Sequence, residues 1–199
     1  MENKSLKFYK VGHQFLNSAI ILLENLVQSK NKKFVISEYE ITEDEYKENT
    51  KYSDFNIIIP VLFNYYHGLE LIIKGALEQV GKLGRDRHDI ISLSNRLKEE
   101  YKEDEKFANC IIEKIDNPII NISKFKEDNE NIDAFSLYEA LRYPDNPKGQ
   151  LINYNSLIFN GENVILGYQE IVKNIKEIKI NTVKKYRELQ LINKRNNNK

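Results

Sequence analysis

Residues 65–90 read YYHGLELIIKGALEQVGKLGRDRHDI, and this stretch decides the fold class. Apolar side chains recur at intervals of three and four residues, which places them on one face of a helix. The pattern predicts a long helix over residues 54–80 that packs against a core. The residues on its apolar face are Leu62, Tyr66, Leu69, Ile73, Leu77 and Val80.

The same helix carries a polar face. Glu70 and Lys74 lie one turn apart with the glutamate first, the order in which an ion pair best supports a helix, and His67 shares their face. The simplest interpretation is a salt bridge on the surface of an ordinary helix, which stabilises by tenths of a kcal/mol.

A turn and a second helix are expected to follow. Gly81 and Gly84 supply the backbone freedom that ends a helix. Asp86 or Asp89 can then accept hydrogen bonds from the first turn of the next helix, as N-cap residues do.

Composition favours a single all-α domain. The chain has 199 residues, of which 41% are hydrophobic and 30% charged, enough for one sizeable core. Four Pro and eight Gly leave long uninterrupted stretches, and alternation of the kind that suits strands is scarce. We therefore expect one helical domain over residues 1–193.

About five long helices are expected. A polar insertion or loop, residues 30–53, separates the first two, and an irregular segment, residues 119–161, precedes the last. Within that segment, the apolar residues around Tyr138 indicate a turn or two of helix or a short extended piece. The composition of residues 194–199 predicts a disordered tail. The expected helices span about 6–29, 54–80, 89–102, 105–115 and the residues from 163 onward.

Several classes of protein and site are disfavoured. Cys110 is the single cysteine and the three histidines are scattered, so we expect no disulfide, no metal site and no cofactor. Glu24 interrupts the apolar patch near the N-terminus, so we expect neither a signal peptide nor a membrane span. A cytoplasmic location follows as an expectation.

Charge is balanced overall but unevenly distributed. The formal net charge is zero, so no global basic field attracts nucleic acid. Residues 38–48 are acidic, whereas the part of the chain from Lys173 onward is rich in lysine and arginine. A solvated helix face explains the basic strip better than a phosphate-binding role does.

Motifs in the order found here resemble those of the HEPN domain family. Members carry Glu-x-x-x-Lys on a long helix, a Gly-containing turn, His-Asp-Leu at the next helix and a later Arg-Tyr-Pro-Asp. The resemblance covers roughly residues 55–145 and implies a helical bundle. The matching positions are Glu70, Lys74, Gly81, His88-Asp89-Ile90 and Arg142-Tyr143-Pro144-Asp145.

The resemblance also raises the question of catalysis. Ribonucleases of the family cut RNA without metal, with an Arg and a His a few residues apart that meet their counterparts across a dimer. Here no His follows an Arg at that spacing, because Arg87 directly precedes His88 and no His lies downstream of Arg142. The usual nuclease motif is absent, and only His88 and Arg142 remain as catalytic candidates.

Each polar candidate has a structural alternative. We favour His88 as a residue that packs at the start of the third helix, and Arg142 as a residue that holds its loop against Glu70 or another buried carboxylate. If these side chains converge, an anion or nucleotide site is the other interpretation. The residues proposed for this polar cluster or ligand site are Glu70, Lys74, His88, Asp89, Arg142 and Tyr143.

Three functions stay open at this point. The preferred one is a non-catalytic HEPN-like module that binds a partner protein, a nucleotide or RNA, in a bacterial defence or toxin–antitoxin setting as the resemblance implies. The second is a divergent metal-independent endoribonuclease with a composite site at a dimer interface. The third is a scaffolding protein that uses its acidic insertion and basic C-terminal part as contact surfaces. The resemblance also implies a homodimer.

Overall fold

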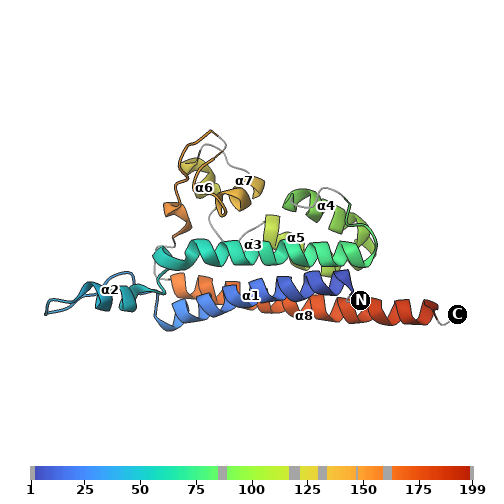
Figure 1. Ribbon diagram of the computed structural model, residues 1–199, viewed down its shortest axis with the longest axis horizontal. Coiled ribbons are helices and arrows are strands. Elements are labelled where there is room, and N and C mark those ends of the chain that lie inside the picture. The colour runs from blue at the N-terminus through green and yellow to red at the C-terminus, as the bar shows by residue number, and fades with distance from the viewer. Residues whose placement is uncertain are drawn as a thin grey trace.

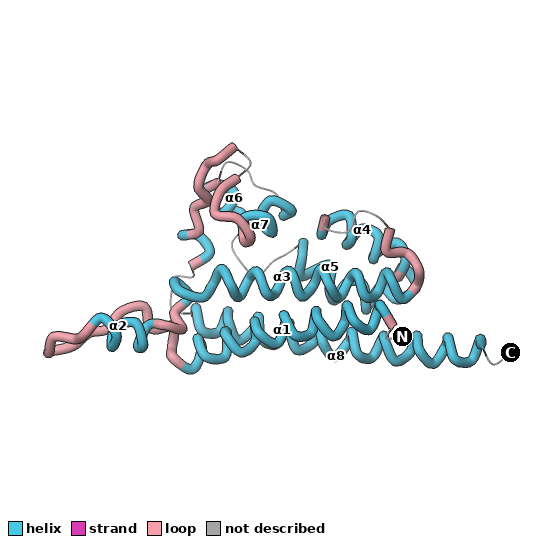
Figure 2. Tube along the Cα trace, in the orientation of Figure 1, coloured by secondary structure: helices cyan, strands magenta, loops and turns pink. Residues whose placement is uncertain are grey.

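The computed structural model describes residues 3–84, 89–116, 122–129, 134–146, 148–158 and 163–197, and within them it confirms the all-α class. Three long helices, α1 (Lys4–Gln28), α3 (Asp54–Gln79) and α8 (Val164–Asn197), run along the long axis of the molecule (Figure 1). In the described ranges, extended pairing is limited to an isolated bridge between Asp145 and Leu151. The same view coloured by element type contains helices and loops (Figure 2).

Helix α1 runs antiparallel to both other long helices. Near its start, the ring of Tyr9 packs edge-on against Tyr186 of α8, with ring centroids 5.4 Å apart. Near its end, Lys176 of α8 forms an ion pair with Glu24. Helix α8 packs mainly along α1 and also contacts α3, at Asp54 and at Gln79.

Helix α3 is the centre of the bundle. Every residue from Leu69 to Leu77 is buried, because α1 and α8 cover one side of the helix and the shorter helices cover the other (Figure 1). A helix with partners on all sides must be apolar nearly all round. By length and composition α3 is the one described helix that could cross a membrane, but 61% of its most apolar window is buried inside the bundle, as in the core helix of a soluble protein.

Small residues allow α1 and α3 to approach closely. A Cβ atom added to Gly68 would lie 2.7 Å from Leu16 of α1, and one added to Gly12 would lie 3.0 Å from the carbonyl oxygen of Gly68. Leu16 is fully buried and has little room to move. The two backbones therefore meet at glycines because no side chain fits between them.

The shorter helices follow the expected positions in part. Helix α4 (Ile90–Glu100) begins directly after Asp89, whose carboxylate accepts a hydrogen bond from the backbone N–H of Ile91. Helix α5 (Glu105–Asp116) follows a 3₁₀ turn (Lys102–Asp104). In the irregular segment, α7 (Ala134–Ala140) lies where a turn or two of helix or a short extended piece was expected around Tyr138. The segment also contains α6 (Ile122–Asp128) and a 3₁₀ turn (Asn155–Leu157), which were not expected.

The polar insertion is an arm that projects beyond the end of the bundle (Figure 1). It was expected as a loop, yet it contains helix α2 (Glu43–Thr50). The sequence carried a signal for this helix: Thr42 and Glu45 form a capping box, in which each side chain accepts from the other residue's backbone N–H. We use the term arm for residues 32–53 below.

A buried carboxylate anchors the base of the arm. Asp54 has no exposed surface and accepts hydrogen bonds from Asn31 (3.0 Å) and from the Tyr168 hydroxyl of α8 (2.9 Å). Lys33 lies 3.2 Å from its other oxygen. The two ends of the arm are thus held together at the first turn of α3.

The end of α8 differs from the expectation of a disordered tail over residues 194–199. The helix continues to Asn197 and extends past the start of α1 (Figure 1). Once a helix has formed, each added residue gains a backbone hydrogen bond for one pair of dihedral angles, so a polar composition alone does not end it. Residues 198 and 199 lie outside the described part of the chain.

The close approach of α1 and α3 predicts an unusual response to alanine. Gly68→Ala should destabilise the protein by about 1–3 kcal/mol through overpacking against Leu16, although alanine favours helices. Gly167→Ala is the matched control, because nothing lies within 4 Å of a Cβ at that position in α8. It should stabilise by about 0.5–1 kcal/mol. Urea unfolding of both variants measures the difference, and equal effects would contradict the packing described.

Candidate functional site

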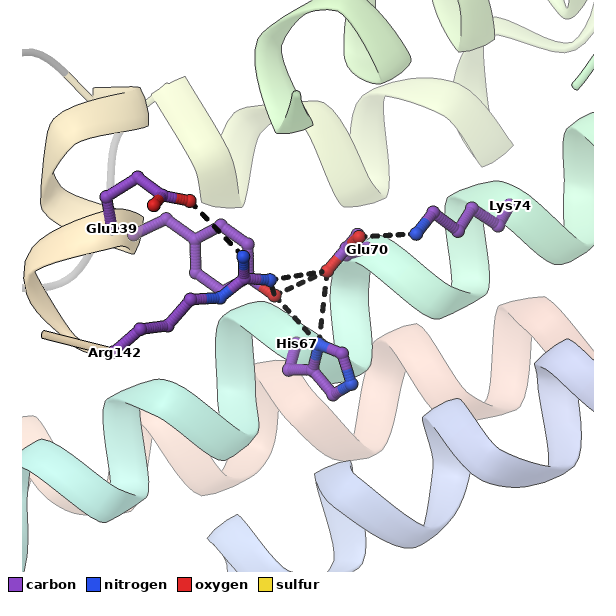
Figure 3. A network of polar contacts seen from close by, with 6 residues as sticks. His67, Glu70, Lys74, Glu139 and Arg142 are labelled. Carbon is purple, nitrogen blue, oxygen red and sulfur yellow. Dashed lines mark hydrogen bonds and ion pairs between the residues drawn. The ribbon is translucent and has the colours of Figure 1, made fainter. Parts of the chain in front are cut away.

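A polar cluster lies between α3 and α7, and the carboxylate of Glu70 is at its centre (Figure 3). Glu70 has no exposed surface and Lys74 is 5% exposed. The expected surface salt bridge is therefore a buried one, because α3 is covered on this side as well. The Lys74 Nζ atom lies 2.5 Å from Oε1 of Glu70.

The second oxygen of Glu70 faces α7 and the residues that follow it. The Tyr138 hydroxyl donates a hydrogen bond to Oε2. The Nη2 atom of Arg142 lies 3.4 Å from the same oxygen and 2.6 Å from the Tyr138 hydroxyl. The guanidinium also lies over the Tyr138 ring, 4.1 Å from its centroid. This confirms the predicted contact of Arg142 with Glu70.

His67 closes the cluster from the preceding turn of α3. Its Nδ1 atom lies 3.1 Å from Oε2 of Glu70 and 2.7 Å from the Tyr138 hydroxyl. A phenol has one hydrogen to donate and two lone pairs to accept with. When Tyr138 donates to Glu70, its two lone pairs face Nδ1 of His67 and the guanidinium of Arg142.

Aromatic neighbours fix the ring of His67. It stacks on Phe63 at a centroid distance of 5.5 Å with an interplanar angle of 6°. Phe15 of α1 meets it edge-on at 4.4 Å. The imidazole is therefore held in one orientation by two helices, with its Nδ1 edge toward the cluster.

The cluster keeps Glu70 ionised. Burial opposes ionisation, but hydrogen bonds from His67, Lys74 and Tyr138 outweigh it and lower the pKa of Glu70 from 4.5 to about 2. Burial and the adjacent Glu70 carboxylate together raise the pKa of Tyr138 above its usual value, so the phenol stays protonated. Tyr138 is thus a hydrogen-bond donor and not a nucleophile.

Charge within the cluster is compensated. Arg142 also contacts Glu139, with Nη1 3.2 Å from Oε1, so two cations face two carboxylates. Such an arrangement offers no excess positive charge to an anion. Arg142 and His67, with 22% and 24% of their side chains exposed, form its solvent-facing edge.

The structure places the proposed site residues in different surroundings. The structure brings together Glu70, Lys74 and Arg142. Asp89 instead caps α4 and accepts a hydrogen bond from the Ser92 hydroxyl at 2.7 Å. The side chain of Tyr143 is exposed, and its carbonyl oxygen accepts from Tyr154. His88 lies outside the described residues.

Three members of the cluster, His67, Tyr138 and Glu139, were not proposed as site residues. His67 had been placed on the correct helix face, but without a role. Tyr138 had been grouped with apolar residues, since a tyrosine in an apolar pattern has no signal that separates a core ring from a hydrogen-bond donor. In the parts of the chain that the structure describes, no three His, Cys, Asp or Glu side chains form a group suited to a metal ion.

The arm is a second feature with functional potential. Large apolar side chains lie open to water along it: Ile36 is 88% exposed, Tyr39 81% and Phe34 64%. Exposed apolar residues grouped on one projecting element are typical of an interaction surface. Because these side chains are exposed, they do not contribute to the core of the bundle. Helix α2 likewise buries only one residue, Thr50.

The cluster predicts a pH dependence of stability. A carboxyl whose pKa falls on folding contributes stability that is present above its unfolded pKa and lost as the pH falls through its folded pKa. Glu70→Gln should therefore unfold more easily than the wild type by about 3 kcal/mol at pH 7, and the gap should narrow as the pH falls from about 5 to about 2.

Glu139→Gln is the matched control for this measurement. It removes a carboxylate that also contacts Arg142 but is 36% exposed, so it should cost under about 1 kcal/mol. Urea unfolding across this pH range gives both values. A constant gap between wild type and Glu70→Gln at all pH values would contradict an ionised Glu70.

Comparison with protein-family models, with curated proteins and with solved structures gives no match to this chain.

Proposed function

We propose that the chain is a non-catalytic HEPN-like helical module that acts by binding a partner protein through its arm. The observation that carries the proposal is the exposure of Phe34, Ile36 and Tyr39 on an element that projects from the bundle. Protein interfaces are built around such apolar and aromatic side chains. The acidic side chains around them favour a partner with a basic surface.

The polar cluster supports the non-catalytic part of the proposal. Arg142 and Lys74 are engaged by carboxylates, and Glu70 is fully buried. These groups hold α7 to α3, which is a structural use. The order of Glu70, Lys74 and Arg142-Tyr143-Pro144-Asp145 along an all-α chain supports the HEPN-like assignment. Roles in bacterial defence or a toxin–antitoxin system, and a cytoplasmic location, stay predictions.

A divergent ribonuclease is the second candidate. It is favoured by one observation: Arg142 and His67 reach the same Tyr138 hydroxyl and share the solvent-facing edge of the cluster. An imidazole and a guanidinium at one point are the groups that metal-independent RNA cleavage uses. In this alternative His67 replaces His88 as the partner of Arg142.

The arm can be tested by capture from host extract. Wild-type protein should retain a partner that the Ile36→Ser/Tyr39→Ser variant loses, because the substitution removes apolar contact area without touching the core. Leu166→Ser/Ile180→Ser is the control, since it removes two exposed apolar side chains from α8. Mass spectrometry identifies what is retained. Equal retention by both variants would contradict the role of the arm.

The ribonuclease alternative has its own test. Wild-type protein incubated with total RNA and a chelator should leave the RNA intact if the module is non-catalytic. Cleavage that persists in chelator and disappears in His67→Gln and in Arg142→Gln, while Glu139→Gln retains it, would establish the second candidate instead. Gel electrophoresis of end-labelled RNA reports the outcome.

A further inference from the structure

The outer part of the arm combines apolar and acidic side chains. Residues 34–46 carry five carboxylates and no Lys, Arg or His. The acidic side chains Glu38 and Glu40 alternate with the exposed Ile36 and Tyr39, and all four are exposed. A surface that accepts this segment must therefore be apolar and basic at once.

A groove of this character lies between α1 and α8. Its volume is about 450 Å³. Burial and the nearby charge of Lys179 lower the pKa of His13 in its wall to about 4, so the imidazole is neutral near pH 7 and the positive charge comes from lysine and arginine. The groove is lined by two kinds of side chain that suit the arm. The apolar or aromatic ones are Leu6, Tyr9, Val183 and Tyr186, and the cationic ones are Lys10 and Arg187.

In the structure, the arm of a chain lies away from the groove of the same chain. The groove contains Tyr9 near the start of α1, whereas the arm begins beyond Gln28 at its end. At 1.5 Å per residue these positions are about 28 Å apart along the helix. The arm is anchored at Asp54 and points away from the bundle, at the end opposite to the start of α1 (Figure 1). Leu6 and Tyr9 of the groove belong to the first turns of α1.

We propose that the arm of one copy docks into the groove between α1 and α8 of a second copy. The argument is charge complementarity together with matched apolar side chains: Glu38 and Glu40 would meet Lys10 and Arg187, while Ile36 and Tyr39 enter the apolar part of the groove. The inference rests on the arm as the binding surface proposed above, and it names the partner. It differs from the symmetric homodimer that the family resemblance implies.

Docking of this kind joins two different surfaces of the chain. Each copy then keeps a free arm at one end and a free groove at the other, so association continues into head-to-tail chains or a closed ring. Because opposite charges face each other, the association weakens as salt screens them. A two-fold dimer, in contrast, uses the same surface twice and stops at two copies.

Analytical ultracentrifugation of the full chain tests the proposal. The average mass should rise with protein concentration at about 0.05 M salt and fall at about 0.5 M salt. Two charge reversals should each weaken association by about tenfold or more: Glu38→Lys/Glu40→Lys in the arm and Arg187→Glu in the groove. Their controls are Glu99→Lys/Glu103→Lys and Lys173→Glu, which make the same charge changes elsewhere on the surface.

Mixing the two variants gives the sharpest result. The arm variant keeps an intact groove and the groove variant keeps an intact arm, and the reversed charges of the two variants also attract each other. An equimolar mixture should therefore form mixed dimers and larger oligomers that neither variant forms alone. That product also shows that both variants are folded. Absence of a dimer in the mixture, or a wild-type chain that is a monomer at every concentration in low salt, would overturn the proposal.

The two experiments together distinguish a failure of self-association from a failure of the proposed binding role of the arm. If the wild-type chain stays monomeric while the arm still captures a different protein from extract in an Ile36- and Tyr39-dependent way, self-association is overturned and the binding role of the arm stands. If capture is also insensitive to these residues, both are overturned.

Discussion

The position of α7 on the bundle depends on the interactions of one buried carboxylate, that of Glu70. An ionised group without exposed surface is costly unless neighbouring donors replace the water it has lost. Lys74 supplies one such donor from the same helix, and Tyr138 and Arg142 supply others from α7 and its end. The charge therefore requires α7 in its place, and this polar requirement adds to the apolar contacts of the buried Leu137 and Ala140 in positioning the helix.

This requirement also decides how the cluster functions. Its groups are those that acid–base chemistry uses, yet each is engaged by a neighbour: Glu70 by four donors, Arg142 by two carboxylates and a phenol, and His67 by two aromatic rings. The arm has no such role inside the bundle, and it carries exposed apolar and acidic side chains beyond the start of α3. The proposed binding surface is thus separate from the groups that hold the bundle together.

Local signals predicted the long helices well. Apolar spacing located α3 to within a residue at its C-terminal end, and Asp89 marks the start of α4 by capping it.

Contacts that depend on tertiary packing were harder to predict from the sequence. The ion pair of Glu70 and Lys74, expected on the surface, is buried because the shorter helices cover that side of α3, and the site role of Tyr138 has no local pattern. The contact of Arg142 with Glu70 was predictable because a loop arginine needs a carboxylate. Helix α2 was missed although its capping box was present in the sequence.

Hydrogen exchange measured residue by residue tests the central claim most directly. In Glu70→Gln, the backbone amides of α7 should lose more protection against exchange than those of α1 and α3, because the substitution removes the charge that holds α7 to the bundle. Unchanged protection in α7, or a uniform loss across all helices, would contradict the account.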